Sequence, residues 1–370
     1  MEVKKSIKKL FNKFSSSPDR ILVTGGMGYI GSHTVVELIN AGYEVCIIDN
    51  LSNSSVDVLN GIEKITGVRP VFENIDCTDY VALDKFFKKY EGIKAIIHFA
   101  AHKAVGESVE KPLPYYRNNL TSLINILELM PLNGIKSIVF SSSCTVYGQP
   151  DELPVKETAP IKKALSPYGN TKQICEEIIH DTIHSNDKIK SIILRYFNPI
   201  GAHPSAEIGE LPNGVPNNLL PYVAQAAAGI RKKLKVFGGD YNTPDGSCIR
   251  DYIDIMDLAK AHVCAMKRLI DGKVESVETF NLGTGRGLSV LEIIKTFEEV
   301  NDIKVPYEMA DRREGDIEQV WADPTYANEV LKWEAKESVE NTLRSVWKWQ
   351  MHLMEQEEDH TKGGGMISGS

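Results

Sequence analysis

The segment "RILVTGGMGYIGSHTVVELINAGYEVCIIDN", residues 20–50, constrains the fold of this chain more than any other. Its first five residues are typical of a strand, the glycines after them of a tight turn, and the apolar spacing of residues 31–41 of a helix. A second β-branched run then ends in Asp49. A strand, a turn, a helix and a second strand in this order predict one βαβ unit of a parallel sheet.

The same alternation continues to about residue 200. Short β-branched runs predict further strands at 70–75, 94–99, 136–141 and 190–195. Periodic segments predict helices between them at 79–90, 119–130 and 168–184. Repeated βαβ order of this kind predicts an α/β fold with a doubly wound, parallel, Rossmann-like sheet.

The character of the sequence changes after residue 200. The stretch "NPIGAHPSAEIGELPNGVPNNLLP" is dense in turn-forming residues and has no regular period. Beyond it we expect a strand pair around "LKVFG" and "CIRDYI", and helices near 219–229, 257–270, 289–300 and 338–354. We therefore expect a domain built on the parallel sheet at 19–199 and a smaller mixed α/β domain at 200–355, with some later segments returning to the first domain.

Composition excludes several classes of protein. A formal net charge of −8 argues against a nucleic-acid partner. The six cysteines form no C-x-x-C pair and lie mostly in apolar runs, so we expect reduced core residues, no metal site and a cytoplasmic protein. No run of about 18 apolar residues is available to cross a membrane.

Both ends of the chain are expected to be tails, at residues 1–18 and 356–370. The first 18 residues carry lysines and apolar residues at helical spacing, but no apolar core of a secretory signal. We interpret them as a basic, disordered, solvated tail. The alternative is an amphipathic helix that touches anionic lipid.

The glycine turn predicts a dinucleotide site. Gly25 permits the tight turn, Gly28 lets a pyrophosphate approach the helix N-terminus, and Gly31 lets the helix pack on the sheet. Asp49, at the end of the second strand, can accept both hydroxyls of an adenosine ribose. The next residues, Asn50 and Leu51, offer no arginine for a 2′-phosphate, so the pattern favours NAD over NADP.

The stretch "SPYGNTK", residues 166–172, predicts a proton-transfer group. Ser166 and Pro167 are typical of a helix start, which places Tyr168 and Lys172 one turn apart on the same face. A free phenol is a poor base at neutral pH, and a nearby ammonium together with an oxidised, cationic nicotinamide is expected to lower its pKa. Tyr168 could then take and return a proton.

A hydroxyl cluster follows the strand expected at 136–141. In "SSSCTVYG", Ser143 and Thr145 are expected at the carboxyl edge of the sheet, where such folds bind ligands. A hydroxyl there can share a hydrogen bond with the tyrosine and a substrate oxygen. The competing interpretations are a polar turn here and a chance surface pair at Tyr168 and Lys172.

Taken together, these residues resemble the extended short-chain dehydrogenase/reductase family, and within it most closely the UDP-glucose 4-epimerase group. The resemblance covers about residues 20–350. It rests on motifs in the family's order: "TGGMGYIGSHT", "HFAAHKAVGESV", "SSSCTVYG", "SPYGNTK", "RYFNPIGAHPS", "PNNLLPY", "DGSCIRDYI" and "RREGD".

The resemblance implies NAD as cofactor and a UDP-hexose as substrate. The implied catalytic residues are Tyr168, Lys172 and Ser143. The implied cofactor residues are Gly25, Gly28, Tyr29, Ile30, Gly31, Asp49, Asn50, Asn53, Ser54, Asp76, Cys77, Phe99, Ala100, Lys103, Asn118, Tyr168, Lys172 and Tyr196. The implied substrate residues are Lys103, Ser143, Thr145, Tyr168, Phe197, Asn198, Asn218, Leu219, Phe237, Arg250, Tyr252, Arg313, Asp316 and Val320.

The reaction implied is transient oxidation at C4 of the sugar, which interconverts UDP-galactose and UDP-glucose. The related 4,6-dehydratases place an acidic pair after the threonine, whereas here Val146 and Tyr147 follow Thr145. Val320 stands where some family members carry a tyrosine, and its smaller side chain is expected to admit N-acetylhexosamines as well. The resemblance also implies a homodimer.

Two other functions stay open at this point. The first is a 4-epimerase of UDP-pentoses such as xylose and arabinose; a uronate substrate would require a further cation that the sugar-site segments lack. The second is an inactive, NAD-sensing protein, which would be expected to have lost Tyr168, Lys172 or Ser143. All three residues are present.

Overall fold

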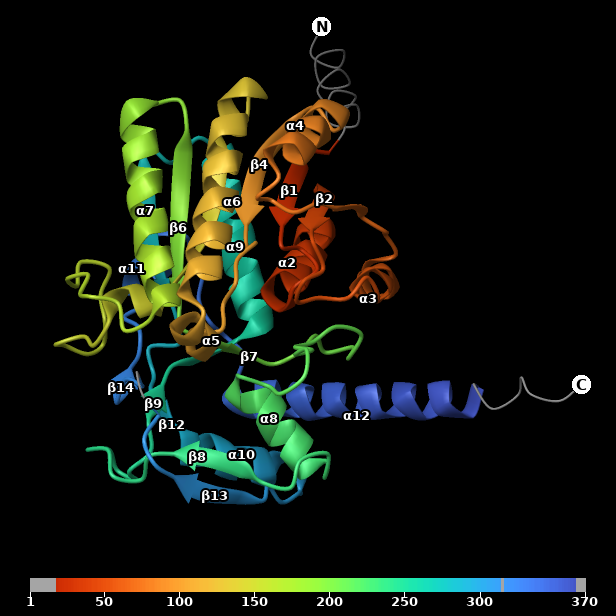
Figure 1. Ribbon diagram of the computed structural model, residues 1–370, viewed down its shortest axis with the longest axis vertical. Coiled ribbons are helices and arrows are strands. Elements are labelled where there is room, and N and C mark those ends of the chain that lie inside the picture. The colour runs from red at the N-terminus through yellow and green to blue at the C-terminus, as the bar shows by residue number, and fades with distance from the viewer. Residues whose placement is uncertain (1–17, 314–315, 364–370) are drawn as a thin grey trace, which may run out of the picture.

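A seven-stranded parallel sheet dominates the computed structural model, which describes residues 18–313 and 316–363 (Figure 1). Its order is β11-β6-β5-β4-β1-β2-β3, and every neighbouring pair is parallel. The strands are β1 (Arg20–Thr24), β2 (Glu44–Asp49), β3 (Val71–Asn74), β4 (Ile93–His98), β5 (Ser137–Ser143), β6 (Lys190–Tyr196) and β11 (Val277–Leu282). The predicted doubly wound sheet is confirmed.

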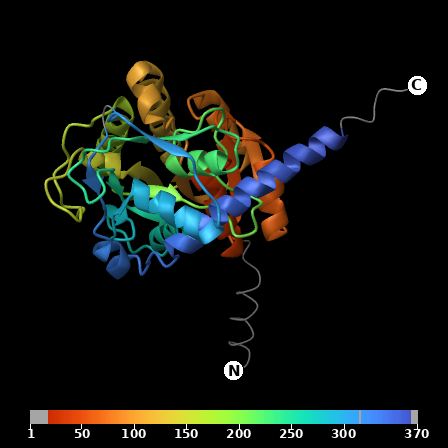
Figure 2. The same cartoon turned by 90° about the horizontal axis from the view of Figure 1, so that it is seen from below.

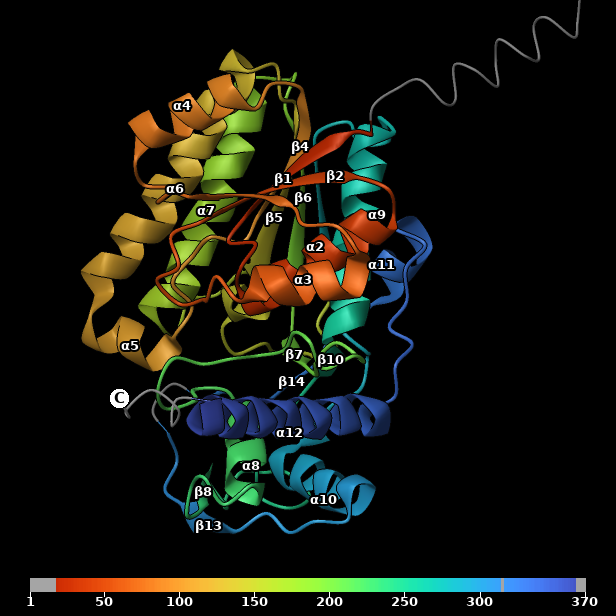
Figure 3. The same cartoon turned by 90° about the vertical axis from the view of Figure 1, so that its right-hand side faces the viewer.

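Helices cover both faces of this sheet (Figure 3). One face packs against α2 (Tyr29–Asn40), α3 (Val58–Thr66), α9 (Ile255–Ile270) and α11 (Thr325–Val330). The other face packs against α4 (Tyr80–Lys89), α6 (Pro112–Leu132) and α7 (Pro167–Ser185). Alternation along β1 serves both cores, because Ile21 and Val23 join the first and Leu22 joins the second.

A smaller layer lies beyond the carboxyl edge of the sheet (Figure 1). Its own core joins residues of α8 (Leu219–Ala227), α10 (Val290–Asn301) and α12 (Val339–Gly363) with β8 (Leu234–Phe237). The connecting elements are α5 (Val105–Glu110), η1 (Cys144–Tyr147), β7 (Asn198–Ile200), β9 (Ile249–Arg250), β10 (Tyr252–Asp254), β12 (Leu288–Ser289), β13 (Tyr307–Ala310) and β14 (Gln319–Val320). The irregular segment predicted after residue 200 therefore leads from the sheet into this layer.

The prediction that the segments "LKVFG" and "CIRDYI" pair with each other is wrong. β8 instead pairs in parallel with β13, while β9 pairs with β12 and β14, and β10 pairs with β7. The residues between the two segments form a local turn, in which the Tyr241 backbone amide donates to the Gly246 carbonyl (3.1 Å). The chain therefore makes no hairpin there, and pairing is decided by distant segments.

The tail expected at 356–370 begins inside a helix. α12 runs on to Gly363 and extends well past the rest of the molecule (Figure 2). Residues 351–362 contain neither proline nor glycine and include several strong helix formers, which explains the continuation. The lysine-rich residues 1–17 and the last seven residues lie outside the described part of the chain.

Two searches of the described residues were negative. Within residues 18–313 and 316–363, no helix is both long enough and apolar enough to cross a membrane. The same ranges contain no group of histidine, cysteine or acidic side chains arranged to hold a metal ion.

A buried ion pair behind the carboxyl edge gives a stability prediction. Glu176 on α7 accepts from Arg195 on β6 (2.5 Å) and from the Ser142 hydroxyl (2.5 Å), and all three residues are buried. Substitution Glu176→Gln leaves the Arg195 charge uncompensated, so we expect the free energy of unfolding to fall by about 3–5 kcal/mol. Denaturant unfolding measures this loss.

The exposed pair of Asp84 and Lys88 on α4 supplies the control. Substitution Asp84→Asn removes the same kind of charge in contact with solvent, and its expected cost is at most about 1 kcal/mol. Equal losses for the two variants would contradict a special role for the buried pair.

Candidate active site

The glycine turn between β1 and α2 has the geometry of a dinucleotide site. Gly25 adopts a left-handed conformation (φ +70°), and a Cβ there would lie 2.8 Å from the Ala100 backbone nitrogen. A Cβ at Gly31 would collide with the Gly25 carbonyl. At Gly28, which precedes α2, a Cβ would meet only that same carbonyl, at 3.3 Å. The helix N-terminus is therefore open to a ligand, as predicted.

The Asp49 carboxylate joins this turn to the end of β2. It accepts hydrogen bonds from the Met27 amide (3.1 Å), the Leu51 amide (2.9 Å) and the Ser54 hydroxyl (2.9 Å). Nearby, the Asn50 side chain donates to Asp76 (3.0 Å). Asp49 is thus oriented toward the turn before any ligand is present.

The residues around the turn fit a nicotinamide dinucleotide. A pocket of about 360 Å³ opens beside Gly28 and Tyr29, and Asn53, Ser54 and Ser32 also line it. No acidic residue occupies the first turn of α2, so nothing there opposes a pyrophosphate. Two of the predicted residues belong to the apolar cores: Ile30 packs against the core that includes α2, and Cys77 is buried in the core on the other face of the sheet.

The three predicted catalytic residues converge at the carboxyl end of β5. Ser143 is the last residue of β5, and Tyr168 and Lys172 lie in the first two turns of α7. The Ser166 hydroxyl caps that helix by accepting from the Gly169 amide (3.1 Å), and Pro167 is its first residue, as predicted. All three catalytic candidates are at most 7% exposed, which excludes the surface-pair interpretation.

The lysine is held by the strand rather than by the tyrosine. Its Nζ donates to the Ser141 carbonyl (2.7 Å) and lies 4.9 Å from the centre of the Phe140 ring. It is 6.0 Å from the centre of the Tyr168 ring. Burial lowers the pKa of Lys172 to about 8.

The predicted lowering of the tyrosine pKa is not found in the protein alone. Burial raises the pKa of Tyr168 well above its usual range, and only the Ser143 hydroxyl opposes the rise appreciably. The reason is that desolvation of the phenolate outweighs an ammonium that is itself buried and bonded elsewhere.

Other polar groups surround this point. The Thr145 hydroxyl is buried and has no hydrogen-bond partner within the described ranges, which leaves it available to a ligand. The Tyr196 hydroxyl bonds to the Ser141 side chain (2.7 Å), and Phe99 packs against His262 with ring centres 4.7 Å apart. Asn118 donates to the side chain of Asn119 (3.0 Å).

A second group of predicted residues gathers at the end of β8. The Arg313 guanidinium lies 5.6 Å from the centre of the Phe237 ring and pairs with Asp316 (2.7 Å). Phe237 is 37% exposed, and the Arg313 side chain is 55% exposed. An aromatic face, a cation and a carboxylate in one place can bind a base, a phosphate and ribose hydroxyls.

Arg250 links this group to the catalytic end. It lies on β9 opposite Val320, and its charge partly opposes the burial that raises the pKa of Cys144, next to Ser143, to about 12. Its charge also acts on Tyr252, which is buried. Val320 packs with Phe197 in a small apolar cluster, so both side chains shape a wall rather than offer hydrogen bonds.

The remaining predicted residues lie around the irregular loop after β6. Asn198 is the first residue of β7, and its backbone amide donates to the Asp251 backbone carbonyl (2.9 Å). Asn218 precedes Leu219, the first residue of α8, and Lys103 follows β4. Lys103 and Asn218 both contact the same carboxylate, which belongs to Glu210.

Some well-placed residues were absent from the sequence prediction. Asn119 is buried and bonds both to the loop after β4, through His102, and to Thr171 on α7. Asp251 is buried and accepts hydrogen bonds from the amides of Thr284, Gly285 and Ala322. Each is a polar residue within an apolar or turn-rich stretch, and that is the only signal the sequence offers.

Proteins of similar sequence indicate the family of this chain. A family model described as GDP-mannose 4,6 dehydratase matches residues 22–346. The chain is 53% identical over 331 residues to the UDP-glucose 4-epimerase of Bacillus subtilis (strain 168). The aligned region covers 89% of this chain and 96% of that protein. It is 47% identical over 338 residues to the UDP-glucose 4-epimerase of Homo sapiens, across 90% of this chain and 96% of that protein.

Solved structures agree with the sequence relatives. The UDP-glucose 4-epimerase of Bifidobacterium longum, in complex with NAD+ and UDP, superposes with a TM-score of 0.86 at 44% identity, covering 90% of this chain and 98% of that one. The enzyme of Stenotrophomonas maltophila, with bound NAD and formylated UDP-arabinopyranose, gives a TM-score of 0.88 at 45% identity, covering 91% and 99%. The chain therefore belongs to the UDP-glucose 4-epimerases of the extended short-chain dehydrogenase/reductase family.

Proposed function

We propose that this protein interconverts UDP-galactose and UDP-glucose by transient oxidation at C4 of the sugar. The observation that carries the proposal is the convergence of Ser143, Tyr168 and Lys172 at the carboxyl edge of the sheet, the same edge that carries the glycine turn after β1. This convergence unites a proton-transfer group with a site that fits a dinucleotide. The similarity to enzymes solved with NAD and UDP supports the same reaction.

NAD is the proposed cofactor, held by the turn at Gly25 and Gly28 and by Asp49. When bound, its oxidised nicotinamide would supply a positive charge and a group that can accept a hydride and give it back. The positive charge is what the raised pKa of Tyr168 requires, because it favours the phenolate that burial disfavours.

The side chains then divide the work. Tyr168 takes the proton of the sugar 4-hydroxyl and later returns it, while Ser143 holds the same oxygen by a hydrogen bond. Lys172 supports the phenolate through its charge. The UDP part is held by Arg313, Asp316 and the other groups near Phe237, so the 4-ketosugar can turn its opposite face toward the hydride while it stays tethered.

A proton NMR experiment tests the proposal directly. Purified protein is mixed with UDP-galactose, first without and then with added NAD. Formation of UDP-glucose without added NAD would support both the reaction and a tightly held cofactor. Formation only after NAD is added would keep the reaction and reject tight retention, and no formation in either case would reject the hexose reaction.

A second candidate differs only in the sugar. The similar enzyme of Stenotrophomonas maltophila was solved with a formylated UDP-arabinopyranose, which is a pentose derivative. A UDP-pentose 4-epimerase is therefore the alternative function, and it would turn over UDP-xylose in preference to UDP-galactose. Relative kcat/KM for the two substrates separates the candidates.

We also propose a homodimeric, cytoplasmic enzyme that acts on a free UDP-hexose. The homodimer follows from the family resemblance, and the cytoplasmic location follows from the reduced cysteines. Sedimentation at micromolar concentration would show a mass of twice the chain if the dimer is correct, and a single-chain mass would reject it.

Loss of the Tyr168 hydroxyl should abolish most of the activity. Tyr168→Phe keeps the buried ring but removes the proton-transfer group, so we expect the turnover number to fall by a factor of about 10²–10⁴. Because the variant leaves the glycine turn and Asp49 intact, its NAD content should match that of the parent protein. Rate by NMR and cofactor released on denaturation measure the two effects.

Tyr90→Phe is the matched control for this loss. The Tyr90 hydroxyl bonds to Glu73 on the edge strand β3 (2.7 Å), which β4, β1 and β2 separate from β5, so its removal should leave turnover unchanged. A Tyr168→Phe protein that retained the parent rate would contradict the assigned role.

The buried Val320 wall predicts a broader substrate range. Because a valine takes less room than a tyrosine, we expect the protein to convert UDP-N-acetylgalactosamine as well as UDP-galactose. Val320→Tyr should then reduce the N-acetylhexosamine rate at least about tenfold more than the hexose rate, through steric exclusion.

The melting temperature of the variant must be measured alongside, since a larger side chain in a packed cluster costs about 1–3 kcal/mol of stability. Absence of any UDP-N-acetylgalactosamine turnover by the parent protein at high enzyme concentration would reject the expectation.

A further inference from the structure

The Glu210 carboxylate accepts hydrogen bonds from two donors of the predicted substrate site. Its Oε1 accepts from Lys103 Nζ (3.4 Å) and from the Asn218 side-chain amide (2.5 Å). Its side chain is 12% exposed, whereas that of Lys103 is 46% exposed. The two donors come from the loop after β4 and the residue before α8, so one carboxylate connects segments more than 100 residues apart in sequence.

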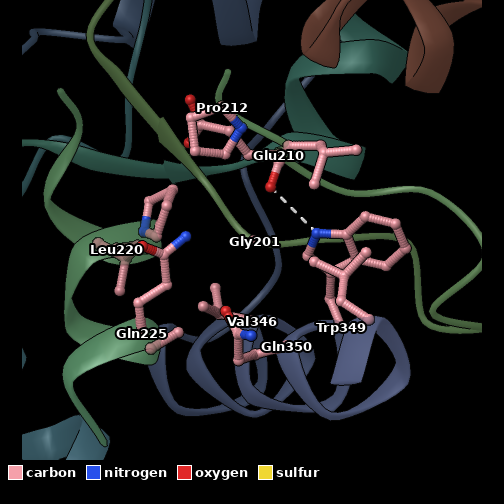
Figure 4. A pocket seen from close by; sticks show the side chains of 12 residues that line it. Gly201, Glu210, Pro212, Leu220, Gln225, Val346, Trp349 and Gln350 are labelled. Atoms are coloured by element: carbon pink, nitrogen blue, oxygen red, sulfur yellow. Dashed lines mark hydrogen bonds between the residues drawn. The ribbon is translucent and has the colours of Figure 1, made fainter. Parts of the chain in front are cut away.

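Helix α12 fixes the backbone that carries this carboxylate. The indole nitrogen of Trp349 donates to the Glu210 carbonyl (3.0 Å), as Figure 4 shows. Gly209 packs so closely on the same indole that an added Cβ would lie 2.6 Å from its ring carbons. Gly209 also bridges to Ala202 across the loop. The carboxylate therefore extends from a loop segment that α12 and Ala202 hold in place.

Lys103 also lies close to the residue that follows the glycine turn. Its Nζ lies 6.0 Å from the centre of the Tyr29 ring, and Tyr29 is the first residue of α2 after the glycine turn. The Tyr29 hydroxyl in turn donates to the Gly201 carbonyl at the start of the loop (2.6 Å). The ammonium is thus held between the turn and the loop, where an exposed lysine would otherwise sample many rotamers.

We propose that Glu210 is a positioning residue, which holds Lys103 and Asn218 ready for the diphosphate of the incoming nucleotide sugar. The inference rests on the proposed function, because the substrate-binding roles of Lys103 and Asn218 are those that the family resemblance implies. Ordering two flexible donors before the ligand arrives removes part of the entropy cost of binding. Glu210 itself carries a negative charge, so it acts through the donors and not by touching the phosphates.

The test compares Glu210→Gln with Glu207→Gln. Glu207 lies on the same loop and pairs with Lys64 (2.9 Å), so its substitution removes an equal charge without affecting Lys103. For Glu210→Gln we expect the Kd for UDP, measured by calorimetry on protein loaded with NAD, to rise about two- to fivefold, which is the range of an exposed ion pair. KM for UDP-galactose should rise equally, kcat should stay within about twofold, and Glu207→Gln should match the parent protein.

A double variant shows whether the effect passes through the lysine. In a Lys103→Met background, the further change Glu210→Gln should add much less to the Kd than it does alone. An unchanged Kd for Glu210→Gln would overturn the proposal. A lower Kd would overturn it too, since it would show that the carboxylate competes with the diphosphate.

The outcome for the parent protein separates this inference from the proposed function. A parent protein that binds UDP and converts UDP-galactose, with Glu210→Gln behaving identically, would reject only the positioning role. A parent protein that binds no UDP would reject both.

Discussion

The attachment of helix α7 to strands β5 and β6 is the constraint on which the site depends. Tyr168, Lys172 and Glu176 follow one another at intervals of four residues, so they form one stripe that faces the sheet. Lys172 bonds to the Ser141 carbonyl of β5, and Glu176 bonds to Ser142 of β5 and Arg195 of β6. These buried charged contacts fix the helix, and the tyrosine at its start lies beside Ser143 as a result.

Burial holds these side chains in fixed positions, but it also disfavours the ionised form of Tyr168. A charge removed from water costs free energy unless it is paired, which explains why Lys172 has a lowered pKa and Tyr168 a raised one. The same low polarity strengthens the effect of a cationic nicotinamide placed nearby. In the proposed mechanism the phenol of Tyr168 is protonated in the protein alone, and a bound cationic nicotinamide would favour the phenolate that acts as the base.

Most of the large sheet could be predicted because its signals are local. Six strands, the glycine turn and the start of α7 each follow from periodicity or capping within a short window, as with Ser166 before Pro167. The seventh strand, β11, escaped prediction; it comes from residues 277–282, after the chain has passed through part of the smaller layer and returned to the sheet. The pairing of β8 with β13 was missed because a partner so distant in sequence leaves no local mark.

The site divides along similar lines. Residue types in short motifs identified the catalytic group, and the structure brings its members together. The direction of the tyrosine pKa could not be predicted, because it depends on how completely the phenol is buried. Glu210 and Asn119 act through contacts with distant segments, so nothing in their own neighbourhoods in the sequence distinguishes them.

The measurement that tests the central claim most directly is the fate of the hydrogen at C4. UDP-galactose labelled with deuterium at C4 would be converted in ordinary water and the product examined by NMR and mass spectrometry. Oxidation and reduction by one enclosed hydride predict UDP-glucose that retains the deuterium at C4. Replacement of the label by solvent hydrogen would contradict the account, because it would require the C4 hydrogen to leave as a proton.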